Sequence, residues 1–198
     1  MAKLVDSYSE TNQNAYGNVW ASYPGEGQSF TAIAGKLGSC KFYCKKNGSP
    51  TGNIWAELYA HAGTYGTSSV PTGSALATSN TIDISTLSTS YTLVKFSFTG
   101  ANLYKLVNGT KYCIAVRYTG GDEYNSLYAG FDNTSPTHSG NAFYLSTVSW
   151  NSRGSGVDDC FYVYLVETVG ILNWFFMKET WQKHDKLWIP KLKEGYSY

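Results

Sequence analysis

Charged residues are scarce in this chain of 198 residues: they make up 15% of it, and the formal net charge is +1. Ordinary soluble domains carry about 25% charged residues, and disordered charged chains carry more. The low content therefore excludes a disordered acidic or basic chain. Lysine and arginine form no cluster, so we expect no nucleic-acid partner bound through its phosphates. No apolar run approaches the roughly 20 residues of a membrane span, and we expect no membrane insertion.

The N-terminus lacks the apolar segment of a secretory signal peptide. It reads MAKLVDSYSE and stays polar afterwards, which predicts synthesis and folding in a cytoplasm. The rest of the chain is rich in Ser, Thr, Asn, Gly and Tyr, a composition typical of extracellular surfaces. A virus particle is built inside a cell and used outside it. A virion location therefore reconciles the two observations and is our expectation.

Cysteine is also rare, with four residues in the chain. Cys40 and Cys44 lie on one expected strand, where four residues span about 13 Å. A disulfide requires Cα atoms within roughly 7 Å, so these two cannot pair with each other. No Cys-x-x-Cys occurs, and no glycine pattern of a nucleotide site is present. We expect no metal, no cofactor, and four free thiols in the core: Cys40, Cys44, Cys113 and Cys160.

The dominant pattern in the sequence is an alternation of apolar and polar residues. In residues 53–61, Ile54, Ala56 and Leu58 face one way, while Trp55 and Tyr59 face the other. Turn signals such as Asn-Gly, Pro-Gly and Gly-Gly separate the runs. This pattern predicts an all-β fold, an antiparallel β-sandwich of jelly-roll type. The other expected strands are residues 28–33, 37–46, 91–98, 111–119, 126–131, 142–148 and 160–168.

The composition changes near residue 168. The last 30 residues hold 8 of the 29 charged residues and three of the six tryptophans. We therefore expect three parts: an N-terminal arm with the first strand (residues 1–26), a β-sandwich (27–168) and a C-terminal docking extension (169–198).

The local structure of the extension has two interpretations. Its tryptophans are seven residues apart, which on a helix over residues 171–188 would form one aromatic stripe. Alternatively, residues 174–178, 180–183 and 187–191 are short strands of a β-hairpin, which Pro190 and the aromatic density favour. In either form the segment is too short to bury its own rings and needs a partner surface. The expected interface anchors are Trp174, Phe175, Phe176, Trp181 and Trp188, with lysines as a polar rim.

Five segments carry a family resemblance: residues 27–31, 35–46, 49–53, 70–79 and 106–113. They read GQSFT, GKLGSCKFYCKK, SPTGN, VPTGSALATS and LVNGTKYC. This order resembles the choice-of-anchor type β-sandwich of bacterial surface proteins and the related jelly-roll structural proteins of tailed bacteriophages. The resemblance covers residues 27–165 and implies a non-enzymatic structural role. The sequence has cysteines where the family usually has aliphatic residues, and it lacks the C-terminal sorting signal of the bacterial members. The phage branch is therefore favoured.

Catalytic chemistry finds little support in the sequence. A glycosidase would use two carboxylates across a sugar, and candidates exist at Glu57, Asp132 and the pairs Asp122-Glu123 and Asp158-Asp159. We interpret the two pairs as a turn cap and a strand start. No Gly-x-Ser-x-Gly elbow is present. We expect no enzyme and no catalytic residue.

Two functions remain. The first is a phage virion structural protein, in capsid decoration, baseplate or tail, that contacts other virion proteins and copies of itself. The alternative is a carbohydrate-binding adhesion module for host surface glycans, because aromatic rings stack on sugars and jelly rolls often hold such sites. The expected stacking residues are Trp55, Tyr59, Tyr65, Tyr124, Tyr128 and Trp150.

Overall fold

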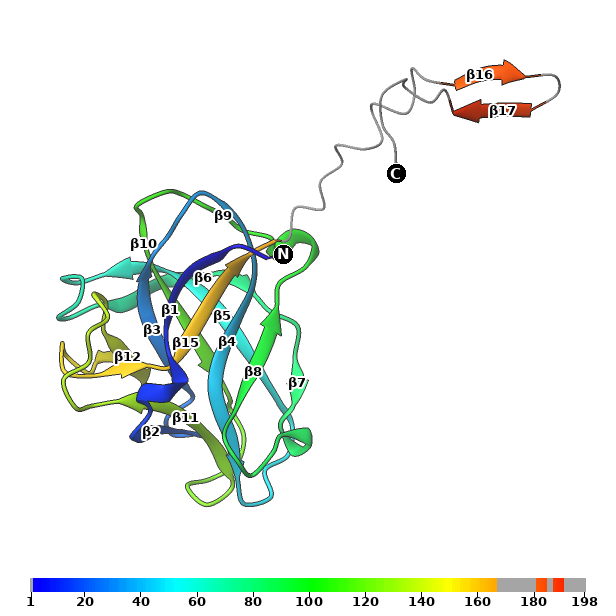
Figure 1. Cartoon of the computed structure of the whole chain (residues 1–198). Helices are drawn as coiled ribbons and strands as arrows, with labels where there is room; N and C mark the ends of the chain where they lie inside the picture. The colour runs from blue at the N-terminus through cyan, green and yellow to red at the C-terminus, as the bar shows by residue number, and fades with distance from the viewer. Residues whose placement is uncertain (1, 167–180, 185–186, 191–198) are drawn as a thin grey trace. The chain divides into compact units, whose positions relative to one another are not determined.

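The computed structural model describes residues 2–166, 181–184 and 187–190 (Figure 1). The chain divides into two compact units, Met1–Glu167 and Thr168–Tyr198. The described part of the first unit contains strands and three short 3-10 helices, and no α-helix. No helix of the described residues is long and apolar enough to cross a bilayer.

The first unit is built from two antiparallel sheets. The first sheet has eight strands, five of them in the order β1-β15-β4-β11-β14; β2 pairs with β11, and β8 and β9 pair with β4. The 13-residue strand β4 is the centre of this sheet, because four other strands pair with it. The bounds are β1 Leu4–Tyr8, β2 Ala15–Val19, β4 Gly35–Asn47, β8 Thr92–Ser97, β9 Lys105–Leu106, β11 Ser126–Asp132, β14 Asp158–Asp159 and β15 Phe161–Leu165.

The second sheet has seven strands. Six follow the order β13-β12-β3-β10-β5-β6, and β7 pairs with β5. Its strands are β3 Gly25–Thr31, β5 Asn53–Ala62, β6 Val70–Thr78, β7 Ile82–Asp83, β10 Lys111–Arg117, β12 Ala142–Leu145 and β13 Trp150–Ser152. The 3-10 helices are Glu10–Asn12, Ile84–Thr86 and Gly100–Asn102. The predicted antiparallel β-sandwich is thereby confirmed.

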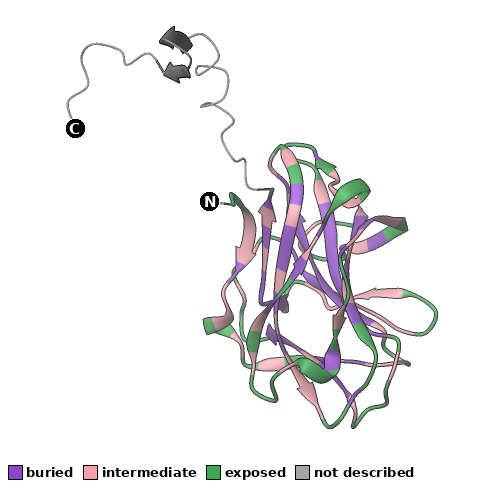
Figure 2. Cartoon of the chain, turned by 90° about the vertical axis from the view of Figure 1, so that its right-hand side faces the viewer, coloured by how far each residue is buried: buried purple, intermediate pink, exposed green. Residues whose placement is uncertain are grey.

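The main hydrophobic core lies between the two sheets. Phe42 and Phe161 from the first sheet and Phe30, Leu58 and Ile114 from the second are buried there. Figure 2 shows the buried positions alternating with intermediate and exposed ones along the strands. This is the period-2 pattern of strands with one face in a core. Burial of each such side chain contributes about 1.5–3 kcal/mol to folding.

The four cysteines are free and buried, as predicted. Cys40 and Cys44 belong to the main core. Cys113 belongs to a second, smaller cluster with Tyr59 and Phe143, on the opposite side of the second sheet. Trp150 packs against this cluster. Burial raises the pKa of the Cys40 thiol and of the other three, so these groups stay protonated at neutral pH.

Two segments are more regular than the sequence suggests. The expected N-terminal arm with the first strand (residues 1–26) contains two strands, β1 and β2, which belong to the first sheet, where Tyr8 pairs with Phe161. Residues 70–78 form β6, although they contain the tripeptide Pro71-Thr72-Gly73, whose residue types favour a turn. The register with β5 shifts between Leu58, which pairs with Ala77, and Ala60, which pairs with Thr72, and Gly73 has a φ of +70°. The tripeptide therefore lies at an irregularity in the strand pairing.

The second unit contains a two-stranded hairpin. β16 (Trp181–His184) pairs antiparallel with β17 (Leu187–Pro190), and Trp188 is the register partner of Lys183. The hairpin interpretation is confirmed for these residues. The alternative interpretation, a helix over residues 171–188, is wrong where the structure describes the segment, since residues 181–184 and 187–190 are extended.

Candidate functional site

A cavity of about 280 Å³ opens at one edge of the sandwich, and we call it the edge pocket. Asn18 comes from β2 of the first sheet, and Glu26 and Tyr144 come from β3 and β12 of the second. Tyr144 is the register partner of Glu26, so both side chains face the same side of the second sheet. The pocket therefore has walls from both sheets. Its lining residues are Asn18, Tyr23, Glu26, Tyr144 and Arg153.

A buried ion pair holds the polar side of the edge pocket. Arg153 donates from Nε to Glu26 Oε1 at 2.5 Å and from the guanidinium nitrogen Nη2 to Glu26 Oε2 at 2.7 Å. This two-bond geometry is the strong form of a charged hydrogen bond. Glu26 is 2% exposed. Burial raises the pKa of Glu26, and the positive charge of Arg153 opposes that rise. In Arg153 burial acts to lower the pKa, but the charge and hydrogen bonds of Glu26 oppose burial and the pKa is raised. Each charge is therefore compensated by the other.

Aromatic rings surround this ion pair. The guanidinium carbon of Arg153 lies 4.7 Å from the ring centre of Tyr144 and 4.9 Å from that of Phe131. Tyr23 approaches Tyr144 with ring centres 6.1 Å apart, and Trp20 packs on Tyr23 at 6.0 Å. Tyr23 is 46% exposed. The pocket thus offers accessible ring surface beside a planar cation.

A third ionisable side chain, Asp159, is close enough to Glu26 and Arg153 for their charges to affect its pKa. It is 0% exposed, and its carboxyl oxygens have no hydrogen-bond partner among the described residues. Burial raises the pKa of Asp159 well above its ordinary value, and the charge of Glu26 adds to the rise while Arg153 opposes it. The lining of the pocket itself carries one cation, Arg153, and one anion, Glu26.

A glycine in β2 makes room for the ion pair. A Cβ at Gly17 would overlap the carboxylate of Glu26. Gly17 and Glu26 lie on the two different sheets, so this close approach is a contact across the sandwich. The absence of a side chain at Gly17 allows the carboxylate of Glu26 to sit between the sheets.

A second polar network lies beside the pocket, and Gln28 of β3 is its centre. Gln28 Nε2 lies 2.6 Å from Asp158 Oδ1 and 3.0 Å from His138 Nδ1. The Gly140 N–H donates to the same His138 nitrogen at 3.0 Å, which assigns the ring proton to Nε2, 3.2 Å from Asp6 Oδ1. Burial raises the pKa of Asp158 to about 6 against the bonds from Gln28 and His138. In Asp6 burial also acts to raise the pKa, but the hydrogen bond and charge of His138 together with the backbone N–H groups of Thr31 and Ser7 outweigh burial, and the pKa is lowered.

The six sequence-predicted stacking residues lie at several places and none lines the edge pocket. Tyr59 is buried, and its hydroxyl bonds with Glu57 and Arg117. Trp150 packs edge-on against Tyr59 at 5.5 Å. Trp55 is the register partner of Arg117 on the same sheet. These three side chains share the outer side of the second sheet.

The other three predicted stacking residues are dispersed. The Tyr65 ring lies under the Lys111 ammonium, 4.1 Å from Nζ to the ring centre. Tyr124 is 72% exposed in the loop before β11. Tyr128 stacks on Tyr16 at 4.1 Å on the outer side of the first sheet. The expected assembly residues Trp181 and Trp188 lie on β16 and β17, and Trp174, Phe175 and Phe176 lie outside the described residues.

The acidic pairs considered for catalysis have structural partners or are buried. Asp122 accepts hydrogen bonds from the backbone of Tyr124 and Asn125, which is how an aspartate caps a turn. Asp158 and Asp159 form β14. Within the part of the chain that the structure describes, no group of three or more His, Cys, Asp or Glu is placed to hold a metal ion.

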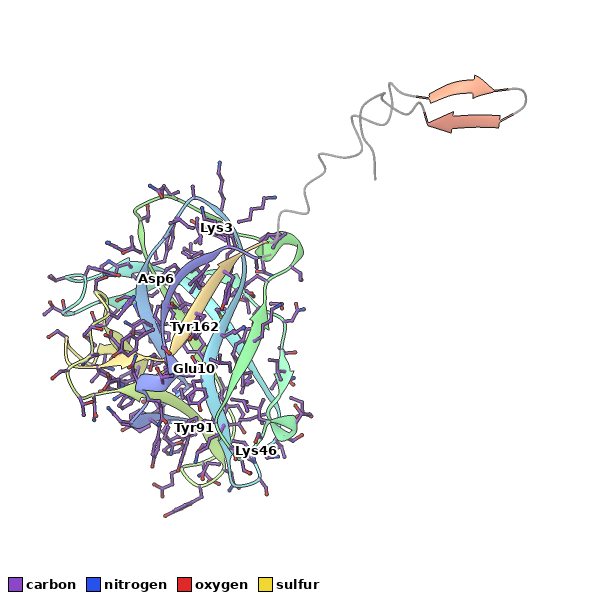
Figure 3. All side chains as sticks on the ribbon, viewed as in Figure 1. Lys3, Asp6, Glu10, Lys46, Tyr91 and Tyr162 are labelled. Atoms are coloured by element: carbon purple, nitrogen blue, oxygen red, sulfur yellow. The ribbon has the colours of Figure 1, made fainter. Side chains whose placement is uncertain are left out.

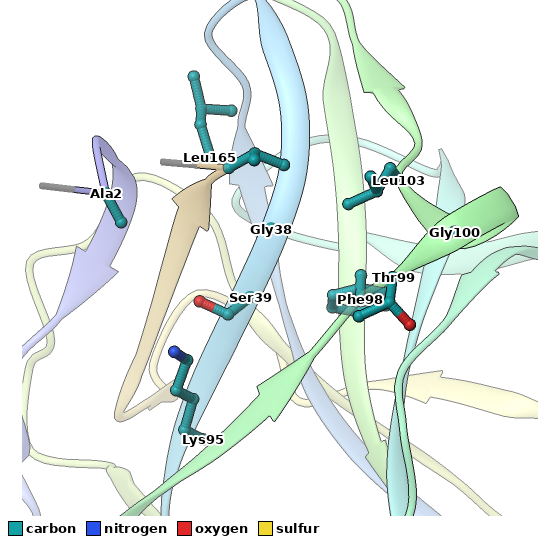
Figure 4. A pocket seen from close by; sticks show the side chains of 10 residues that line it. Ala2, Gly38, Ser39, Lys95, Phe98, Thr99, Gly100, Leu103 and Leu165 are labelled. Atoms are coloured by element: carbon teal, nitrogen blue, oxygen red, sulfur yellow. The ribbon is translucent and has the colours of Figure 1, made fainter. Parts of the chain in front are cut away.

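A second cavity of about 340 Å³ lies near the start of β1 and the end of β15 (Figure 4). Phe98, Leu103 and Leu165 form much of its wall, and Lys95 is its one charged residue. The edge pocket has the richer set of directional polar groups, and we regard it as the better candidate for a ligand site.

Sequence reasoning missed the edge pocket because its residues are spread over residues 18–153. One local signal was present. Glu26 stands between two glycines in GEGQSF and is the one charged residue of that segment. A charged residue in such a strand is rarely buried without a partner, so its burial points to a nearby cation.

Comparisons with known proteins give little further information. No family model matches the chain, and no curated protein matches it. Among solved structures, the cysteine protease and lectin-like domains of Cwp84, a surface layer associated protein of Clostridium difficile, align with a TM-score of 0.45 and 12% identity. The alignment covers 80% of this chain and 37% of that chain, so this chain spans little more than a third of its length. A likeness at this level leaves the function open.

The contact between Gly17 and Glu26 predicts an unusual sensitivity to a methyl group. Gly17→Ala should lower the free energy of unfolding by about 1–3 kcal/mol, because the new Cβ must displace a buried carboxylate from its partner. Gly156→Ala is the matched control, since a Cβ there meets nothing within 4 Å. Urea denaturation of the two variants measures the difference. Equal stabilities would contradict the packing described.

The raised pKa of Asp158 predicts a pH-dependent stability. The folded state binds this proton more tightly than the unfolded state, whose ordinary value is 3.8, so Asp158 contributes less stability as pH rises from about 4 to about 6. Over that range the native protein should lose stability relative to Asp158→Asn. Above pH 6 the difference should be constant. Chemical denaturation of both proteins at several pH values measures it, and a difference independent of pH would refute the assignment.

Proposed function

We propose that this chain is a non-enzymatic carbohydrate-binding module whose ligand site is the edge pocket. The observation that carries the proposal is the combination of exposed Tyr23 with the Glu26–Arg153 ion pair in one cavity. Sugars have apolar C–H faces and hydroxyl edges. Aromatic rings match the faces, and fixed charged groups match the hydroxyls.

The size and charge of the pocket favour a small, uncharged sugar unit. Its volume of about 280 Å³ is just below the range of about 300–1,000 Å³ for small-molecule pockets. The charges of the pocket lining balance, since Glu26 is paired with Arg153. A neutral monosaccharide unit, alone or at the end of a chain, is therefore the ligand class that fits.

The same geometry supports a binding role rather than hydrolysis. A glycosidase needs two carboxyl groups that reach the scissile bond, one as acid and one as base or nucleophile. Both oxygens of Glu26 are held by Arg153. Asp159 is fully buried and absent from the pocket lining. Neither group is free to act on a bound sugar.

Substitutions in the edge pocket should weaken glycan binding selectively. Tyr23→Ala removes an exposed ring, and Arg153→Lys keeps the charge but loses the planar two-bond contact with Glu26. We expect each to reduce the affinity for a bound sugar by about tenfold, equivalent to ~1.4 kcal/mol. A glycan array finds the ligand, and calorimetry with that ligand measures the affinities.

Tyr124→Ala is the control, since it removes a more exposed tyrosine outside the pocket. Circular dichroism verifies that each variant folds. Loss of binding in Tyr124→Ala or Trp55→Ala, with binding retained in Tyr23→Ala, would move the site to the residues suggested by the sequence. An array without any bound glycan would refute the function.

A role as a phage virion structural protein is the second candidate, and the glycan module would then serve host attachment. Its support is the separate C-terminal unit, Thr168–Tyr198, which contains the β16–β17 hairpin and three of the six tryptophans. Aromatic anchors carry much of the binding energy at protein interfaces. In this proposal the second unit binds other virion proteins or sister copies.

Truncation tests the assembly role. A chain ending at Glu167 keeps every residue of both hydrophobic clusters, so it should fold with an unchanged melting temperature. Sedimentation should show self-association of the full chain and a monomer for the truncated one. If the full chain were a monomer, self-association through the second unit would be excluded. Unfolding of the truncated chain would contradict the division into two units.

A further inference from the structure

The outer side of the first sheet carries a group of tyrosine and lysine side chains that is separate from the edge pocket. We define the tyrosine–lysine face by six residues: Lys41, Lys45, Tyr91, Lys95, Tyr128 and Tyr164. They come from β4, β8, β11 and β15 and from the residue before β8. Figure 3 is a view onto this sheet and labels Tyr91 there. All six side chains keep partial exposure.

Two lysines of this face stand directly opposite each other. Lys41 on β4 is the register partner of Lys95 on β8, so the two side chains leave the same side of the sheet. Cβ atoms of such partners are about 4.5–5.5 Å apart, and like charges in these positions repel. This pair costs stability in the free protein. An anion between the two ammonium groups would relieve the repulsion.

The lysines also lie over tyrosine rings. Lys45 Nζ is 4.9 Å from the ring centre of Tyr91 and 5.4 Å from that of Tyr128. Lys41 Nζ is 5.3 Å from the ring centre of Tyr164. These contacts hold the ammonium groups beside aromatic surface. Lys41 and Lys45 are four residues apart on one strand, which places their Cα atoms about 13 Å apart.

Another lysine pair shows that charge alone is not the distinguishing feature. Lys36 on β4 is the register partner of Lys105 on β9, and both are exposed. Among the described residues, neither lies over an aromatic ring in the way that Lys41 and Lys45 do. The tyrosine–lysine face therefore combines two features, a pair of opposed lysines and aromatic rings beneath lysine ammonium groups. The Lys36–Lys105 pair has the opposed lysines but lacks the rings.

We propose that the tyrosine–lysine face binds an extended anionic polysaccharide, with its acid groups at Lys41, Lys95 and Lys45 and its sugar rings against the tyrosines. Charge complementarity assigns the acid groups, and the spaced rings along one sheet suit a chain rather than a single sugar. A nucleic acid fits less well. Nucleic-acid-binding domains usually have a pI above about 9, whereas this chain has a pI near 7.6.

The test uses the full-length chain and two acidic polymers, polygalacturonate and dextran sulfate, with uncharged dextran for comparison. Calorimetry at low salt should show binding to an acidic polymer that excess dextran does not displace, with affinity that falls as salt is raised. The double variant Lys41→Gln/Lys95→Gln should weaken this binding by about tenfold or more. Tyr128→Ala should weaken it as well, because a ring is lost without a change of charge.

Lys36→Gln/Lys105→Gln is the matched control, with the same loss of charge from a cross-strand pair on β4. It should leave the affinity within about twofold of the native value. If this control lost as much affinity for the acidic polymer as Lys41→Gln/Lys95→Gln, net charge alone would explain the loss and the proposal would be overturned. So would the absence of binding to both acidic polymers, or tighter binding to duplex DNA or to vesicles with anionic lipids.

The outcome is independent of the edge pocket. Tyr23→Ala should leave the acidic polymer bound as tightly as in the native protein, because Tyr23 belongs to the other site. Loss of polymer binding in Tyr23→Ala would place the polymer in the edge pocket and refute a second surface. Failure of the glycan array with intact polymer binding would refute the proposed pocket function and leave this inference standing.

Discussion

The buried ion pair between Glu26 and Arg153 is the interaction on which one end of the sandwich depends. A carboxylate between two sheets is tolerated only when a cation compensates it, and removal of one partner from such a pair typically costs about 3–5 kcal/mol. The pair has space for the Glu26 carboxylate at Gly17, and the Arg153 guanidinium lies against the rings of Tyr144 and Phe131. The polar side of the edge pocket is built from these contacts.

The inner side of β3 shows how the polar end joins the apolar core. Glu26, Gln28 and Phe30 follow each other at alternate positions of this strand and all three are buried. Glu26 bonds to Arg153, Gln28 bonds to Asp158 and lies beside His138, and Phe30 packs in the main core. Polarity therefore decreases along one strand. This gradient places the hydrogen-bonding groups of the strand near the open edge of the sandwich.

The sequence predicted the fold well because a strand with one buried side has alternating apolar and polar residues, and this alternation can be recognised in the sequence alone. All eight expected strands exist, and the alternation of Cys40, Phe42 and Cys44 identified core thiols correctly. The candidate site could not be predicted in the same way. Glu26 and Arg153 are 127 positions apart, and nothing local to Arg153 indicates its partner. Tyr59 and Trp150 looked like ligand platforms from their strand and loop positions, yet their rings pack on one another.

The two proposed surfaces differ in electrostatics, and that difference separates their ligands. The two charges in the lining of the edge pocket are paired with each other, so selection there rests on shape and hydrogen bonds. The tyrosine–lysine face keeps Lys41 and Lys95 opposed and partly exposed, so attraction there acts at longer range and weakens with salt. A chain that carries acid groups along its length and ends in a neutral sugar would satisfy both surfaces. In that case each weak contact would raise the effective concentration of the ligand at the other.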